Sequence, residues 1–237
     1  MKNLLETKVG AVVSKDYRTA RVFSAHGIDF CCKGGITVAE ACARNEADEQ
    51  KLKAEIEQLL AQQESPDDEL LKLSLPALID HILANHHIYI RETAPLLEAY
   101  LLKIANVHGQ RHPELINLYS LFRHSHHDLQ QHMVKEEQIL FPIIRRVAEQ
   151  QQPFSPGQRD SLAAPIAGME HEHTIEGDRF REMRTSTANF TPPADACQTY
   201  RVAFKMLEEF EMDLHRHIHL ENNVLFVRAQ KLVTDKV

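Results

Sequence analysis

The sequence of 237 residues contains no tryptophan, only eight glycines and few aromatic residues, and these absences argue against a protein built from sheets. Leucine, alanine, glutamate, glutamine and lysine are abundant, and such a composition favours helices. Only four cysteines are present, two adjacent and the others far apart, which excludes the disulfide framework of a small secreted domain. We therefore expect an all-α globular protein in a reducing compartment.

Two further absences narrow the function. No uncharged apolar run reaches about 18 residues, so we expect no membrane-spanning helix. The formal net charge of −7 and the lack of a long Lys/Arg block argue against nucleic acid as a partner. Glu6 and Lys8 interrupt the N-terminal segment where a signal peptide requires apolar residues, so we expect a cytoplasmic protein.

Residues 1–64 are predicted to form a small helical domain. Thr37 and Glu40 have the spacing of a capping box, which predicts a helix that begins there and continues to about Gln62. Residues 65–75 include a polar, proline-interrupted stretch and are interpreted as a linker. A core of this size is marginal on its own, so we expect the domain to dock on another surface, which a homodimer would provide.

Cys31 and Cys32 are adjacent in a glycine-flanked loop of this domain. One interpretation is that they are ordinary small residues in a turn. The other is a pair of reactive or metal-contacting thiols on an exposed loop, where Lys33 favours the thiolate form. Cys42 on a helix and Cys197 after a Pro-Pro turn are expected to be structural.

Four long helical segments are predicted within residues 76–237. They cover residues 76–106, 113–149, 162–188 and 194–230, separated by breaks that contain glycine or proline. Long helices joined by short to moderate connections predict an up-down-up-down four-helix bundle. The expected architecture is this bundle preceded by the small helical domain.

A His-x3-Glu pattern occurs twice in matching apolar contexts, as His132 with Glu136 and as His217 with Glu221. Residues four apart on an α-helix point to the same side, so each copy directs an imidazole and a carboxylate the same way. Both pairs also fall on the apolar faces of their predicted helices. The repeat therefore indicates two helices that face a shared site.

Buried carboxylates require an explanation. An ionised glutamate in an apolar core is very costly unless it is paired or bound to a metal, and two at one level repel each other. One or two metal dications remove this difficulty. In the third predicted helix the apolar face selects His173 over His171 as a further inward ligand. In the first helix, periodicity does not decide between His86 and His87.

The position of a histidine along the bundle axis shows whether it can reach the same site as His132. Counted from a turn at Gln110, His87 lies 23 residues before it and His132 lies 22 residues after it, so the two match in an antiparallel pair. His108 ends its helix far from that level and is expected at the surface or in a loop. Histidines off the apolar faces are also expected to be solvated: His124, His126, His127, His215 and His219.

The candidate ligands are imidazole nitrogens and carboxylate oxygens without a cysteine. Such ligands suit iron or manganese, with zinc possible, and exclude a soft thiolate site. Four histidines and two glutamates are too many for one tetrahedral zinc ion, and they indicate a dinuclear site with bridging carboxylates. The Glu-x-x-His repeat of ferritin-like bundles and the His-Glu-x-x-His motif of zinc proteases are absent.

The inward histidines and the two His-x3-Glu pairs resemble a hemerythrin-like di-iron domain. With the upstream segment Asp29-Phe-Cys-Cys-Lys-Gly-Gly35 and the segments 133–142 and 220–226, the chain is similar over nearly its whole length to the iron–sulfur cluster repair di-iron proteins. The resemblance implies two iron ions, bridged by carboxylates and by an oxo or hydroxo group. It selects His87 over His86 and implies the ligands His87 and His217 on one iron, His132 and His173 on the other, and Glu136 and Glu221 bridging both.

The departures from the family pattern are small. Val227 stands where proline often follows, and Asp128 stands where glutamate is expected one turn before His132. Asp128 and Glu172 are hypothesised to support the ligands from outside the metal site.

The resemblance implies a stress protein that restores iron–sulfur clusters damaged by nitric oxide or oxidants, with the damaged proteins as partners. In that function, Cys31 and Cys32 would contact a recipient cluster or iron in transit. One alternative is a di-iron nitric oxide reductase. Another is a hemerythrin-like carrier or sensor that binds O2 or NO. All three functions need the same ligand set, so the residues alone do not choose between donor and enzyme.

Overall fold

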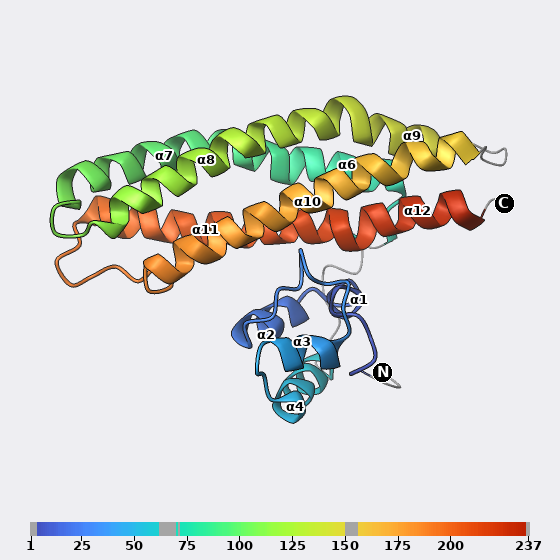
Figure 1. The fold of residues 1–237 in the computed structure, drawn as a ribbon, viewed down its shortest axis with the longest axis horizontal. Coiled ribbons are helices and arrows are strands. Elements are labelled where there is room, and N and C mark those ends of the chain that lie inside the picture. The colour runs from blue at the N-terminus through green and yellow to red at the C-terminus, as the bar shows by residue number, and fades with distance from the viewer. Residues whose placement is uncertain (1–3, 62–69, 71, 150–155, 236–237) are drawn as a thin grey trace. The chain divides into compact units, whose positions relative to one another are not determined.

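The computed structural model describes residues 4–61, 70, 72–149 and 156–235 (Figure 1). Every regular element in these residues is a helix, apart from an isolated antiparallel bridge between Lys8 and Thr37. The expected all-α class is therefore confirmed. Within the same residues, no helix is long and apolar enough to cross a membrane. Most of the predicted linker, residues 65–69 and 71, lies outside the described residues.

The chain divides into two compact units. One consists of Met1–Ile79, Ile144–Ala163 and Arg216–Val237, and the other consists of Asp80–Ile143 and Ala164–His215. The predicted domains, residues 1–64 and 76–237, rest on sequence composition, which is a different criterion, and they remain a prediction.

The N-terminal part of the first unit contains short helices. They are α1 (Val9–Val13), α2 (Thr19–Ala25), α3 (Val38–Arg44) and α4 (Glu49–Leu60). Both halves of the predicted capping box between Thr37 and Glu40 are present. The prediction of a single helix that continues to about Gln62 is wrong. The helix ends before Glu46, whose φ is +52°, and α4 begins as a separate helix. Asp48 caps this second helix by accepting hydrogen bonds from two backbone N–H groups.

The four long segments expected from the sequence are all helical, and three of them contain a π-helical turn. The first comprises α6 (Leu75–Ile82), η1 (Leu83–His87) and α7 (Ile88–His108), and the second comprises α8 (Glu114–Lys135), η2 (Glu136–Leu140) and α9 (Phe141–Glu149). The third is α10 (Pro156–Ser186), and the fourth comprises α11 (Gln198–His219), η3 (Leu220–Leu225) and α12 (Phe226–Asp235).

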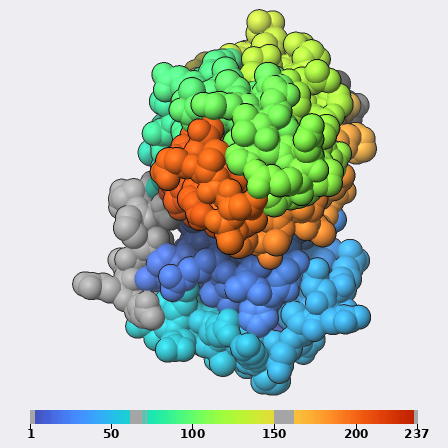
Figure 2. Space-filling view, turned by 90° about the vertical axis from the view of Figure 1, so that its left-hand side faces the viewer, coloured from blue at the N-terminus to red at the C-terminus, as the bar shows by residue number. Residues whose placement is uncertain are grey.

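The second unit is an up-down-up-down four-helix bundle formed by α7, α8, α10 and α11, as expected (Figure 1). Its core includes Phe210 of α11, whose ring contacts Phe122 of α8 edge-on at 5.4 Å and stacks with Phe180 of α10 at 5.9 Å. All three side chains are fully buried. At one end of this unit, the turn between α7 and α8 (green) and the connection between α10 and α11 (orange) lie side by side at the surface (Figure 2).

Candidate metal centre

Three π-helical turns carry three of the predicted metal ligands and His86, the alternative to His87. His86 and His87 end η1, Glu136 begins η2, and Glu221 is the second residue of η3. A π-turn closes i→i+5 hydrogen bonds and so contains one residue more than an α-turn, and such turns are frequent at functional sites. None of the three was predicted, because residue periodicity does not reveal a single wide turn.

The buried faces of the second unit bring four candidate ligands together. His87 Nε2 lies 3.4 Å from Glu136 Oε2, and His132 Nε2 lies 3.2 Å from Glu136 Oε1. His173 Nε2 lies 2.9 Å from His132 Nε2. Glu136 thus stands between two histidines that come from different helices, and its side chain is completely buried.

In the first unit, His217 and Glu221 form the other His-x3-Glu pair. His217 Nε2 lies 2.9 Å from Glu221 Oε1, and both side chains are at most 1% exposed. The pair is therefore oriented as the spacing predicts, with imidazole and carboxylate on the same side of the helical segment.

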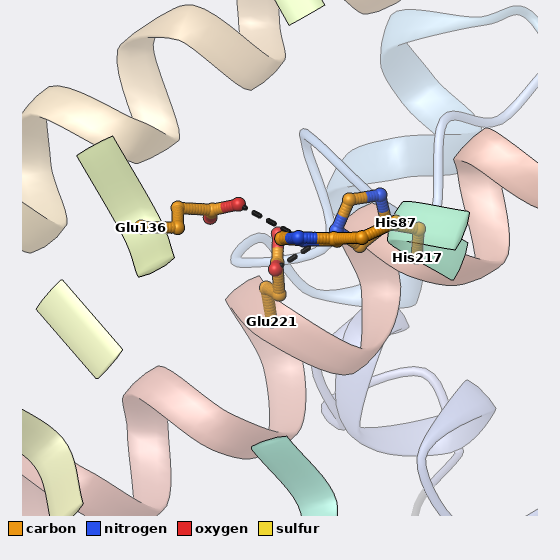
Figure 3. A group of neighbouring side chains, drawn as sticks. All are labelled: His87, Glu136, His217 and Glu221. Carbon is orange, nitrogen blue, oxygen red and sulfur yellow. Dashed lines mark hydrogen bonds and ion pairs between the residues drawn. The ribbon is translucent and has the colours of Figure 1, made fainter. Parts of the chain in front are cut away.

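All six predicted metal ligands occur in two groups whose ligand atoms lie within 4.8 Å of one another. The first group is His87, Glu136, His217 and Glu221, and the second is His132, Glu136, His173 and Glu221. Figure 3 shows the two carboxylates and two imidazoles of the first group pointing toward one another. Both groups contain Glu136 and Glu221.

The ligand set fits a metal centre on chemical grounds. Two completely buried carboxylates repel each other, and desolvation makes their ionised forms costly. A cation held between them removes both costs. Imidazole nitrogen and carboxylate oxygen are suitable ligands for iron, manganese or zinc.

Two family models match separate parts of the chain. Residues 5–60 match ScdA_N, a domain of unknown function, and residues 78–229 match the hemerythrin HHE cation binding domain. The chain is 34% identical over 221 residues to the iron–sulfur cluster repair protein ScdA of Staphylococcus haemolyticus, covering 93% of this chain and 96% of that protein. The chain belongs to the ScdA/YtfE family.

Two further relatives are the iron–sulfur cluster repair proteins YtfE of Enterobacter sp. and of Citrobacter koseri. The first is 35% identical over 93% of this chain and 95% of its own length, and the second is 36% identical over 90% and 91%. The predicted family resemblance is confirmed, and with it the presence of a metal-binding hemerythrin-type domain.

In this ScdA/YtfE-family chain, two carboxylates outside the ligand groups accept hydrogen bonds from the Nδ1 atoms of candidate ligand histidines. Glu172 Oε2 accepts a hydrogen bond from His132 Nδ1 at 2.8 Å, and Lys135 contacts the other oxygen. The hydrogen bond from His132 is the main reason that the pKa of Glu172 falls to about 2. Such carboxylates orient a metal-binding imidazole and increase its basicity. The structure thus places Glu172 next to the candidate ligand His132.

Glu137 makes the corresponding contact with His87, which the sequence did not predict. Its Oε1 accepts hydrogen bonds from His87 Nδ1 at 2.7 Å and from Arg91 Nη2 at 2.6 Å. Burial raises the pKa of Glu137, but these hydrogen bonds outweigh that effect and lower it overall. Its position directly after Glu136 was the available signal.

Asp128, the other hypothesised supporting residue, has a different partner. Its Oδ2 accepts a hydrogen bond from Arg179 Nη2 at 2.7 Å, and the side chain is 55% exposed. Arg179 also binds the buried Glu176, so Asp128 belongs to a polar group on α8 and α10.

Three further histidines outside the ligand groups are buried, and two of them were expected at the surface. His219 was expected to be solvated but is only 1% exposed, and burial lowers its pKa to about 3. His108 was expected at the surface but is 5% exposed, with its Nε2 at 3.2 Å from Cys197 Sγ. Neither buried contact was visible in helical periodicity, because the partners are far away in sequence. His86 is buried like His87, but its Nδ1 binds Asp213 at 2.9 Å.

The predicted thiols lie in a loop that is less open than expected. Cys31 is only 3% exposed, and Cys32 is half-buried. A hydrogen bond with Cys32, followed by burial, raises the pKa of the Cys31 thiol well above its usual value, which opposes the predicted thiolate form at Cys31. The sulfur atoms lie 3.7 Å apart, without a disulfide.

The carbonyl side of this loop is held by the residues that follow Glu221. Asn222 Nδ2 and Asn223 Nδ2 each donate a hydrogen bond to the Cys31 carbonyl oxygen at 3.2 Å. Asp29 Oδ1 accepts hydrogen bonds from the backbone N–H groups of Cys31 and Cys32, at 3.2 and 2.9 Å. The thiol loop is therefore fixed from both sides.

Proposed function

We propose that the protein repairs iron–sulfur clusters damaged by nitrosative or oxidative stress, by supplying iron from a di-iron centre. The observation that carries this proposal is the pair of ligand groups that share Glu136 and Glu221. The names of the relatives, which are iron–sulfur cluster repair proteins, support the same function.

In this proposal, six residues hold two iron ions. His87 and His217 bind one, His132 and His173 bind the other, and Glu136 and Glu221 bridge both, with an oxo or hydroxo group as the remaining bridge. The hydrogen bonds from His87 to Glu137 and from His132 to Glu172 orient two of the four imidazoles.

Release of iron would depend on its oxidation state. Carboxylates are hard ligands and hold iron(III) more firmly than iron(II), so reduction would weaken the binding of the iron that is delivered. Charged Glu136 and Glu221 would then lose a counterion, and their burial would favour rebinding of a cation or uptake of a proton.

Cys31 and Cys32 are proposed to contact a recipient cluster or iron in transit. Their sulfurs, 3.7 Å apart, lie with an Asp29 oxygen in a group of potential metal ligands. Because the Cys31 pKa is raised, the thiol has to lose its proton when it binds a metal, so this contact is expected to release a proton.

A di-iron nitric oxide reductase is the second candidate. Two ligand groups with two shared carboxylates would keep two ferrous ions adjacent, which suits the coupling of two NO molecules to nitrous oxide. A reversible O2 or NO carrier or sensor would use the same ligands but retain its iron.

One anaerobic experiment separates these functions. The reduced, iron-loaded protein is incubated with an NO-damaged cluster protein, and cluster recovery, iron transfer and nitrous oxide are followed together. Repair predicts that cluster recovery parallels iron loss, without catalytic nitrous oxide. Repeated nitrous oxide turnover with full iron retention would contradict the donor function and favour the reductase, whereas a stable oxygenated spectrum with neither outcome would favour a carrier.

We also propose that the protein acts in the cytoplasm as a homodimer. No disulfide joins the four cysteines, which suits a reducing compartment. Sedimentation of the purified chain tests the dimer, and a monomer at all concentrations would contradict it.

A further inference from the structure

Cys197 is a further thiol in the second unit, and it lies at the opposite end of α7 from the candidate ligand His87. Cys197 immediately precedes α11, and its carbonyl oxygen accepts the first hydrogen bond of that helix, from Arg201 N–H at 3.1 Å. The side chain is exposed. The thiol is therefore accessible to a reagent at the start of that helix.

His108 at the end of α7 faces this sulfur. Its Nε2 lies 3.2 Å from Cys197 Sγ, and the histidine is buried, with only 5% of its surface exposed. The other ring nitrogen, Nδ1, is buried without a hydrogen-bond partner among the residues that the structure describes. A buried imidazole normally satisfies both nitrogens, so one whose single polar contact is a thiol requires a chemical reason.

The surroundings restrict which group can exchange a proton with the thiol. Tyr200 packs against the rings of both His108 and His112, at 5.6 and 5.9 Å. The two nitrogens of His112 are occupied by Glu114 and Asp195, each at 3.1 Å. Arg111 forms an ion pair with the same Asp195. His108 is therefore the imidazole available to Cys197.

We propose that Cys197 and His108 form a reactive thiol site that takes low-molecular-weight disulfides. His108 Nε2 accepts the thiol proton, and the Cys197 sulfur attacks one sulfur of the disulfide. A new S–S bond joins Cys197 to half of the reagent, the original S–S bond breaks, and the leaving thiolate takes up one proton. The product is a mixed disulfide at the N-terminus of α11 that a thiol can reverse, and no metal is involved.

The test uses the full-length protein and oxidised glutathione as the probe. Adduct formation at each of the four cysteines is measured by peptide mass mapping over time at neutral pH. We expect Cys197 to react about tenfold faster in the folded chain than in the same chain unfolded in guanidinium chloride, since only the folded chain supplies the base. Buried Cys42, whose pKa is raised by burial, is the internal control and reacts more slowly when folded.

Variants then assign the effect to His108. His108→Gln keeps a polar side chain at the site but removes the base, and we expect it to slow the Cys197 reaction about tenfold. His112→Gln is the matched control, because it changes the neighbouring histidine that also packs on Tyr200, and its Cys197 rate is expected to stay at the wild-type value. Equal Cys197 rates in wild type and a folded His108→Gln variant would overturn the proposal, as would a slower reaction in the folded wild type than in the unfolded chain.

Discussion

Glu172 accepts a hydrogen bond from Nδ1 of His132, so the nitrogen that remains for a metal is Nε2. Glu137 does the same for His87. Each carboxylate fixes the orientation and the proton position of one imidazole, and neither carboxylate belongs to the two ligand groups. The proposed di-iron centre thus has two supported histidines before any metal binds.

The Glu172–His132 contact predicts a loss of metal affinity on substitution. Glu172→Gln removes the charge that increases the basicity of His132, and we expect iron affinity to fall about 10- to 100-fold. Chelator competition measures it. Glu170→Gln changes an exposed glutamate of the same helix and serves as the control. Asp128→Ala is expected to leave iron affinity unchanged, since Asp128 pairs with Arg179. An unchanged affinity in Glu172→Gln would contradict the supporting role.

Replacing a shared carboxylate is expected to separate metal binding from folding. Glu136→Leu and Glu221→Leu each remove one of two buried carboxylates that repel each other, so the metal-free protein should gain stability. Both variants should keep their helix content but lose the bridged di-iron spectrum and part of the iron. Glu209→Leu, at an exposed position of α11, is the control. Two irons with an unchanged spectrum in either variant would contradict the bridging assignment.

The sequence predicted the four long helices and the inward direction of His132 and His173, because a 3.6-residue period describes most of each helix. It failed after Glu136. Continued in steps of three and four residues beyond Glu136, the apolar face would include Ile139, yet Ile139 is 53% exposed while Leu140 and Ile144 are buried. The π-turn η2 adds one residue and rotates the rest of the segment, so every later position of the face is displaced.

Other failures concern contacts between distant segments. His219 lies off the apolar face of its helix, but Ser14 and Asn223 bind its two nitrogens and the rings of Tyr17 and Phe30 pack against it. A helical pattern treats such a position as solvent-facing, since it carries no information about a second surface that packs there. The buried state of Cys31 was missed for the same reason.

The capping box of α3 predicts a pH-dependent contribution to stability. Hydrogen bonds from the Thr37 backbone and side chain lower the pKa of Glu40 below its ordinary value of 4.5. A group with a lowered folded-state pKa stabilises the fold above its unfolded pKa, and this contribution disappears as the pH falls through the lowered value. Glu40→Gln should therefore reduce the melting temperature at neutral pH, with a difference from wild type that shrinks below about pH 4.5.

Thermal melts at several pH values check this prediction. Glu57→Gln, an exposed glutamate of α4 with only a 4.0 Å contact to Lys53, should show no comparable dependence on pH. A wild-type-to-Glu40→Gln difference that grows as the pH falls would have the wrong sign for a carboxylate stabilised in its charged form.

The close packing of Gly10 against Asn223 predicts that a single methyl group disturbs the thiol loop. A Cβ at Gly10 would lie 2.0 Å from Asn223 Oδ1, in a helix where alanine would otherwise be favoured by about 1 kcal/mol. Overpacking typically costs about 1–3 kcal/mol, so the clash outweighs the helix preference and Gly10→Ala should be destabilising. Displacement of Asn223 would also weaken its hydrogen bond to the Cys31 carbonyl, and Cys32 should become more reactive toward thiol reagents.

Gly35→Ala is the control, because nothing lies within 4 Å of its added Cβ. Adding Asn223→Ala to Gly10→Ala removes the clashing side chain and should recover stability. Cys32 should nevertheless stay more reactive than in the wild type, because the hydrogen bond from Asn223 is still missing. A Gly10→Ala protein with unchanged melting temperature and Cys32 reactivity would show that Asn223 does not restrain the loop.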